Sequence, residues 1–141
     1  MIYTDLTKKA LKLSFEAHKN QVDKSGMPYV YHPFHLAEQM DNEYTTVVAL
    51  LHDVVEDTNY TFDDLIEMNF PSEVIEALKL LTHSKDIDYL DYVRRIKKNE
   101  MARKVKLADL LHNSDITRLD EIDDKVLIRV EKYKEAIEIL K

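Results

Sequence analysis

Residues 47–58 read VVALLHDVVEDT, and the rest of the chain is organised around this stretch. An apolar run ends in His52 and Asp53, and Glu56 and Asp57 follow within one further helical turn. Because residues three and four apart share a helix face, we expect one imidazole and three carboxylates to gather at one end of a helix. Carboxylates this close repel one another unless protons or a cation relieve the charge. The stretch therefore predicts a site for a divalent metal ion.

The composition limits the class of protein. With 141 residues the chain is long enough to bury a core, and we expect a single domain over residues 1–141. The absence of cysteine excludes disulfides and thiolate metal sites. No apolar run is long enough to span a bilayer, and the N-terminal segment lacks the continuous apolar region of a signal peptide. We therefore expect a cytoplasmic protein that holds any metal through histidine and carboxylate side chains.

The charges are unevenly distributed along the chain. A net charge of −7 argues against a general binder of nucleic acids or anionic membranes. Residues 41–78 contain ten carboxylates and no lysine or arginine, whereas residues 94–106 contain seven basic side chains. Two solvated helix faces of opposite sign would explain most of these charges. Alternatively, some basic residues border the acidic metal site and hold an anionic substrate.

Helix formers dominate the sequence, which contains one glycine and three prolines. Apolar residues recur at three-to-four spacing, and no stretch shows the alternation of a strand. We therefore predict an all-α fold, a compact bundle of about seven to nine helices. Gly26 is expected in a defined turn over residues 21–31. The expected helices span approximately residues 4–20, 32–40, 44–57, 62–69, 72–81, 88–98, 100–114 and 124–140.

Asp109 is the second residue that points to a metal. Four apolar neighbours flank it within the helix expected at 100–114, and a buried charge needs a partner. With His32, His52 and Asp53 it would provide two imidazoles and two carboxylates, a set that suits Mn, Fe, Zn or Mg-like ions. In a purely structural interpretation His32 caps a helix, His52 and Asp53 end one, and Asp109 forms a salt bridge. The four residues taken together favour the metal.

Three further polar positions have candidate roles. Glu56 and Asp57 could orient and deprotonate a water molecule whose pKa the cation lowers, or could simply form an exposed acidic helix end. Asn113 could hold a ligand carboxylate or a substrate oxygen, or could only end its helix. The other histidines are interpreted as structural and not as ligands: His18, His35, His83 and His112.

Three segments occur in a characteristic order: HKNQVDKSGMPYVYHP (18–33), ALLHDVVEDT (49–58) and VKLADLLHN (105–113). Together they resemble the HD-domain metal-dependent phosphohydrolases, and within them the hydrolase domain of RelA/SpoT-type proteins and the stand-alone small alarmone hydrolases. The resemblance covers nearly the whole chain. It implies an all-α fold and one metal ion, usually Mn²⁺, bound by His32, His52, Asp53 and Asp109, with Glu56 and Asp57 as the pair that activates water.

The resemblance also implies a reaction, the removal of pyrophosphate from the 3′ position of guanosine tetra- or pentaphosphate to leave GDP or GTP. Lys24 and Asn113 match positions near the nucleotide, and we expect Lys85, Arg103 and Arg118 among the residues that hold phosphates. Because the chain stops at Lys141, a hydrolase without a synthetase domain is expected.

The turn over residues 21–31 departs from the family. Asp23 stands where an arginine is common, and Asn20 stands where a glycine is usual. An arginine can stack on a guanine, and a carboxylate cannot. Two alternatives therefore stay open: hydrolysis of another nucleotide or phosphomonoester, and a non-catalytic helical module that binds metal or nucleotide.

Overall fold

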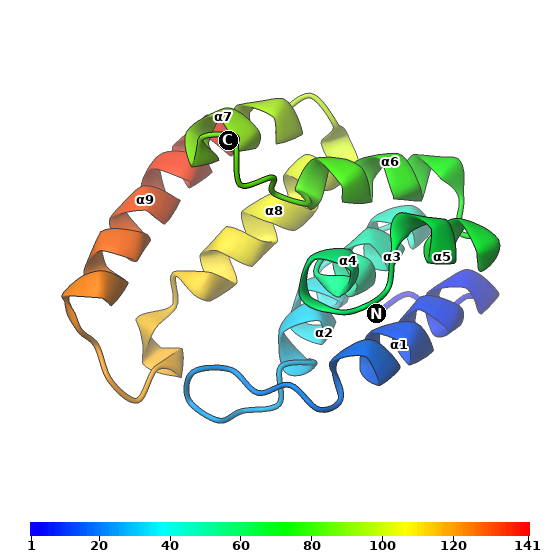
Figure 1. The fold of residues 1–141 in the computed structure, drawn as a ribbon, viewed down its shortest axis with the longest axis horizontal. Helices are drawn as coiled ribbons and strands as arrows, with labels where there is room; N and C mark the ends of the chain where they lie inside the picture. The colour runs from blue at the N-terminus through cyan, green and yellow to red at the C-terminus, as the bar shows by residue number, and fades with distance from the viewer.

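A computed structural model describes all 141 residues. The chain forms nine α-helices and one 3₁₀ helix, with no strand apart from an isolated bridge between Val22 and Pro28 (Figure 1). The predicted all-α fold is confirmed. In chain order the elements are α1 (Asp5–His18), α2 (Tyr31–Glu38), α3 (Glu43–Leu51), α4 (Val54–Asp57), α5 (Phe62–Glu67), α6 (Ser72–Leu81), α7 (Tyr89–Ile96), α8 (Glu100–Asn113), η1 (Ile116–Arg118) and α9 (Asp124–Leu140).

Helix α3 is the centre of the bundle. Every residue from Thr45 to Leu51 is buried, as expected for a helix that is apolar on all sides. It packs against α1, α2, α6 and α8, while α7 and α9 lie on the far side of α8 (Figure 1). Residues 47–51 are therefore part of the core, and His52, which follows them, is also buried. None of the helices combines the length and the apolar character needed to cross a membrane.

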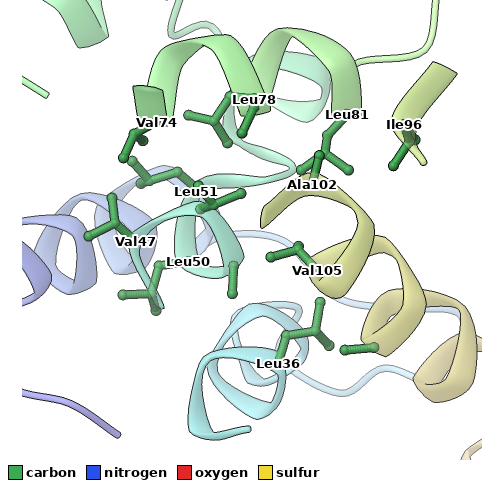
Figure 2. Packing of buried hydrophobic residues seen from close by; sticks show 14 of the residues in the cluster. Leu36, Val47, Leu50, Leu51, Val74, Leu78, Leu81, Ile96, Ala102 and Val105 are labelled. Atoms are coloured by element: carbon green, nitrogen blue, oxygen red, sulfur yellow. The ribbon is translucent and has the colours of Figure 1, made fainter. Parts of the chain in front are cut away.

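One contiguous core connects these helices. It contains 27 buried residues, and Figure 2 shows side chains of α3 meeting those of α2, α6 and α8. Leu51 of α3 lies beneath Leu78 of α6, Val47 lies beneath Val74, and Val105 of α8 lies to one side of them (Figure 2). His32 lies on α2, His52 directly follows α3, and Asp109 lies on α8. Because the core holds these three helices together, it also fixes the relative positions of the predicted metal ligands.

Replacing Leu78 by alanine will destabilise the fold by about 2–5 kcal/mol, because it removes a side chain that is only 2% exposed and leaves a cavity. Urea unfolding followed by circular dichroism measures the change. The matched control is Leu127→Ala on α9, where the leucine is 50% exposed, and its effect should stay within about 0.5 kcal/mol. Equal losses of stability at the two positions would contradict the burial of Leu78 in the core.

Polar N-caps begin most of the helices where the sequence predicts them. Thr61 accepts a hydrogen bond from the Asp64 amide at the start of α5, and Asp123 accepts one from the Val126 amide at the start of α9. Helix α5 ends two residues earlier than predicted, since Asn69 takes a left-handed conformation with φ of 65°. The short helix η1 was not predicted.

The helix expected over residues 44–57 is broken in the structure, which corrects the prediction. Helix α3 ends at Leu51, and α4 begins at Val54. The His52 side chain donates from Nδ1 to the Ala49 carbonyl at 2.7 Å, and in a continuous helix that carbonyl would accept from the Asp53 amide. Asp53 itself lies in the sparsely populated bridge region, with φ of −104° and ψ of 0°. The break therefore lies at the two residues predicted to bind metal.

Candidate metal centre

Three helices bring the predicted ligands together. His32 lies in the first turn of α2, His52 follows the last residue of α3, and Asp109 lies in α8. The Nε2 atom of His32 is 2.8 Å from Oδ1 of Asp109, and Nε2 of His52 is 3.6 Å from the same oxygen. These three ligand atoms lie within 4.8 Å of one another, and all three residues are buried. Their arrangement could hold a metal ion.

Asp53 joins this group to the acidic pair. Its Oδ2 atom is 3.0 Å from Nε2 of His52 and 4.0 Å from Nε2 of His32. Its carboxylate also lies within 4.8 Å of the carboxylates of Glu56 and Asp57. All six residues predicted to bind metal or activate water are thus neighbours, with Asp53 between the two sets.

The donor atoms fit a divalent cation. The Nε2 atom of His52 is buried and makes no hydrogen bond, although two carboxylate oxygens lie within 3.6 Å of it. Since Nδ1 of His52 donates to the Ala49 carbonyl, the lone pair of Nε2 is directed into the site. A buried polar atom without a partner is rare, and a cation would satisfy this one together with the two carboxylates.

The charged groups of the site shift one another's pKa values, because carboxylates and basic side chains lie close together away from water. Burial disfavours an imidazolium at His52, but Asp53 and Asp109 outweigh it and hold the pKa of His52 well above its usual range. Burial also disfavours the charged form of Asp109, but Lys106, His32 and His52 hold the pKa of Asp109 well below its usual range. The low pKa values of Asp53 and Asp109 favour the ionised carboxylates that a metal ion requires.

A second layer of polar side chains orients the ligands. Tyr29 donates its hydroxyl hydrogen to Oδ2 of Asp53, and Asn113 donates from Nδ2 to Oδ1 of Asp109 at 3.0 Å. Lys106 lies 2.9 Å from the other oxygen of Asp109. Such outer partners fix the direction of metal-binding side chains. Asn113 is also the last residue of α8, so it ends its helix and at the same time holds the Asp109 carboxylate.

Sequence reasoning missed three of these partners: Tyr29, Lys106 and His112. His112 was interpreted as structural, yet its Nδ1 atom is 2.7 Å from Nδ1 of His32, and the two rings are parallel to within 3°. Burial, with Arg118 and two other histidines nearby, lowers the pKa of His112 to about 4, so its ring is a neutral acceptor for the His32 hydrogen. For two of them a usable signal was the helical spacing, since Lys106 and His112 each lie three residues from Asp109. Tyr29 lies in the turn before α2, and its partner Asp53 is distant in the sequence.

Glu56 and Asp57 point to solvent beside the ligands. Oε1 of Glu56 accepts from the His83 amide at 3.0 Å, and Gln21 donates to the Asp57 carbonyl at 2.9 Å. Burial, Asp53 and Glu56 together raise the pKa of Asp57 to about 6. A carboxylate with a raised pKa at the edge of a metal centre is suited to accept a proton from water.

A cavity of about 330 Å³ opens next to His32. It lies between the turn over residues 21–31, η1 and α9, and it has an apolar wall formed by residues such as Val126 and Tyr133. Basic side chains line it as well, namely Lys24, Arg118 and Arg129, together with Asn113. Lys24, Asn113 and Arg118 were predicted to contact substrate, whereas Arg129 was not.

Two predicted phosphate-binding residues lie outside this cavity. Arg103 donates to the Leu140 carbonyl at 3.2 Å and so ties α8 to the end of α9. Lys85 is exposed on the connection between α6 and α7, two residues after His83, whose amide contacts Glu56. The structure therefore groups Lys24, Asn113 and Arg118, and it separates Arg103 and Lys85 from them.

Asp23 has a structural role in the turn. Its Oδ1 atom accepts from the amides of Ser25 and Met27 at 2.9 and 3.0 Å, and these bonds shape the turn around Gly26, whose φ is 79°. Its Oδ2 atom lies 3.8 Å from Arg118 at the edge of the cavity.

Comparison with known proteins identifies the fold and the family. The sequence profile of the HD domain matches residues 10–114, which include every residue of the metal centre. The chain belongs to the HD-domain family. A metazoan ortholog of SpoT that hydrolyzes ppGpp superposes on this HD domain with a TM-score of 0.80, over 100% of this chain and 88% of the other. Because the sequence identity of that pair is 23%, the likeness establishes the fold alone.

The resemblance to SpoT-like hydrolases is confirmed by relatives of higher identity. The guanosine-3′,5′-bis(diphosphate) 3′-pyrophosphohydrolase MESH1 of Xenopus tropicalis is 35% identical over 117 residues, 74% of this chain. A GTP pyrophosphokinase of Myxococcus xanthus is 34% identical over 144 residues, 89% of this chain. The aligned part of this chain spans 65% of the length of the Xenopus relative and 19% of the length of the Myxococcus relative.

Proposed function

We propose that this chain, as a single HD-type domain over residues 1–141, is a Mn²⁺-dependent nucleotide pyrophosphohydrolase. Its proposed substrate is guanosine 3′,5′-bis(diphosphate), from which it releases the 3′-pyrophosphate to leave GDP, and GTP from the pentaphosphate. One observation carries the proposal: two buried imidazoles, the buried Asp109 and the half-buried Asp53 adjoin an exposed acidic pair. On another side lies a cavity whose lining includes three basic and two acidic side chains. The names of the relatives support the choice of substrate.

The residues that would hold the ion are His32, His52, Asp53 and Asp109. A divalent ion bound there would act as a Lewis acid on a phosphoryl oxygen and lower the pKa of water. Carboxylate and imidazole ligands suit Mn²⁺. His52 and His32 are held in the required tautomers by Ala49 and His112, and Tyr29 and Asn113 orient the two carboxylates.

Asp57 and Glu56 would handle the proton of the attacking water. Partial burial and its acidic neighbours raise the pKa of the Asp57 carboxylate to about 6, and the residue remains exposed to solvent. The His83 amide fixes Glu56, and Gln21 fixes the backbone of Asp57. The Glu56 carboxylate and the backbone that carries Asp57 are therefore positioned before substrate arrives, which favours catalysis.

The cavity beside His32 would bind the nucleotide. Lys24, Arg118 and Arg129 provide positive charge for phosphate groups, and the apolar wall with Tyr133 can pack against a base. Lys85, on the exposed connection near Glu56, could contact the departing pyrophosphate. Arg103 would take no part, because its side chain is bound to the end of α9.

One observation favours a second candidate, a different nucleotide processed by the same centre. Asp23 places a carboxylate at the wall of the cavity, and a carboxylate repels phosphates and can accept from the amino group of a base. The base preference of this chain could therefore differ from that of the relatives.

Incubation of the purified protein with ppGpp tests the proposal. With Mn²⁺ we expect one pyrophosphate to be released for each ppGpp consumed, and with a chelator in excess we expect no release. Ion-exchange chromatography of the nucleotides measures the reaction. A parallel screen of other nucleotides and phosphomonoesters for phosphate or pyrophosphate release separates the second candidate from the first. A wild-type protein that binds Mn²⁺ but leaves ppGpp intact would refute the substrate assignment.

Adding Mn²⁺ will raise the melting temperature of the protein. An ion that binds only the folded state at about 100 times its Kd stabilises by about 2.7 kcal/mol, which corresponds to a rise of several degrees. Differential scanning fluorimetry with and without a chelator measures the shift. The variant Asp53→Ala serves as the control, and the same rise in both proteins would show that the ion binds elsewhere.

A further inference from the structure

Lys106 is a largely enclosed cation next to the metal centre. Its ammonium lies 2.9 Å from Oδ2 of Asp109, and the side chains of the two residues are 13% and 9% exposed. The other oxygen, Oδ1, faces His32 and His52. Asp109 thus has a cation on one oxygen and the candidate metal position on the other.

Aromatic rings close the space around Lys106. Its ammonium lies 5.4 Å from the centre of the Tyr92 ring and 5.8 Å from that of Tyr89, both on α7. These faces favour a cation and exclude water. Lys106 is not among the residues that line the cavity beside His32. Its charge is therefore directed at Asp109 and not at a substrate in that cavity.

We propose that Lys106 is a positioning residue that keeps Asp109 a one-oxygen ligand and limits the affinity of the site for its metal ion. The inference rests on the metal centre of the proposed function. Because Oδ2 is bound to the ammonium, only Oδ1 can turn toward the imidazoles, and a coordination position stays free for water or substrate. The same positive charge repels a divalent ion and so weakens its binding.

Removing the charge has two consequences. A lysine charge a few ångströms from a divalent ion weakens binding by about a factor of ten even with the screening of bulk water. In Lys106→Met the methionine can pack under the tyrosine rings, while Oδ2 of Asp109 loses its partner and becomes available to the metal. The variant should therefore bind metal more tightly, with more oxygen ligands, and turn over more slowly.

The experiment compares Lys106→Met, Lys106→Arg and Lys104→Met with the wild type. Lys104 lies on the same helix and carries the same charge, but it pairs with Glu100 at 3.4 Å. Titration calorimetry gives the Kd for Mn²⁺, and the visible bands of bound Co²⁺ report the coordination number. We expect Lys106→Met to bind Mn²⁺ about tenfold more tightly, to show weaker Co²⁺ bands, and to lose about 10–100-fold in kcat. Lys106→Arg and Lys104→Met should keep the wild-type Kd and bands.

A role in packing alone would give a different result. Lys106→Met would then melt at a lower temperature and keep the wild-type Kd and bands, which would overturn the inference, as would weaker Mn²⁺ binding. If Lys106→Met does not fold, Lys106→Gln removes the same charge while keeping a donor, and it should also bind Mn²⁺ more tightly. A wild-type protein that binds neither ion would instead refute the metal centre of the proposed function.

Discussion

Replacing Asp53 by alanine will abolish the metal-dependent release of pyrophosphate and the tight binding of Mn²⁺. Asp53 is the residue that joins the two functional groups, since its carboxylate lies 3.0 Å from His52 and also adjoins Glu56 and Asp57. Its removal takes a ligand from the ion and leaves Tyr29 without its acceptor. Losing the Lewis acid costs several kcal/mol of transition-state stabilisation, which corresponds to about 10³-fold or more in kcat.

The measurement combines a ppGpp turnover assay with metal analysis of the purified variant. Asp63→Ala is the matched control, because Asp63 is an exposed carboxylate in the first turn of α5. It should keep wild-type metal content and rate. If Asp53→Ala retains both a bound ion and turnover, the assignment of Asp53 as a ligand is wrong.

The variant Asp57→Asn will bind Mn²⁺ like the wild type and will turn over about 10²–10⁴-fold more slowly. General base catalysis typically contributes that range, and an amide cannot accept the proton. The substitution keeps the size of the side chain and leaves the Asp57 carbonyl to accept from Gln21. Single-turnover kinetics with the Mn²⁺-loaded protein separates the chemical step from binding.

The pair of variants distinguishes ligands from proton acceptors. Asp53→Ala should lose metal and rate together, whereas Asp57→Asn should lose rate alone. Asp63→Asn is the isosteric control for the second variant. An Asp57→Asn protein with a normal rate would assign the proton transfer to Glu56 or to another group.

The architecture explains why a buried helix can end in so many charges. Helix α3 is anchored by apolar contacts on all sides, so its last residues cannot move away from the carboxylates. The break after Leu51 then turns Glu56 and Asp57 toward solvent, while His52 stays in the interior. Had α3 continued to Asp57, as the sequence suggests, the same face would have carried all four side chains.

Much of this protein follows from the sequence itself. The three-to-four spacing of apolar residues and the scarcity of glycine and proline predict helices at nearly the positions observed, because amphipathic periodicity and capping are local properties. The motifs around His52 and Asp109 identify the family because the residue types and their order can be read directly from one sequence. Both kinds of information are readable without knowing which helices touch.

Only the tertiary structure decided the break at His52 and Asp53, the enclosure of Lys106 by the tyrosine rings of α7, and the separation of Arg103 from the cavity. Each depends on a contact that helical periodicity does not predict. The His52 side chain bonds the Ala49 carbonyl in place of a backbone amide, the Lys106 ammonium lies against a tyrosine ring of α7, and the Arg103 guanidinium bonds the end of α9. The sequence determined which residues can bind a metal, and the packing of α2, α3 and α8 determined which of their atoms face one another.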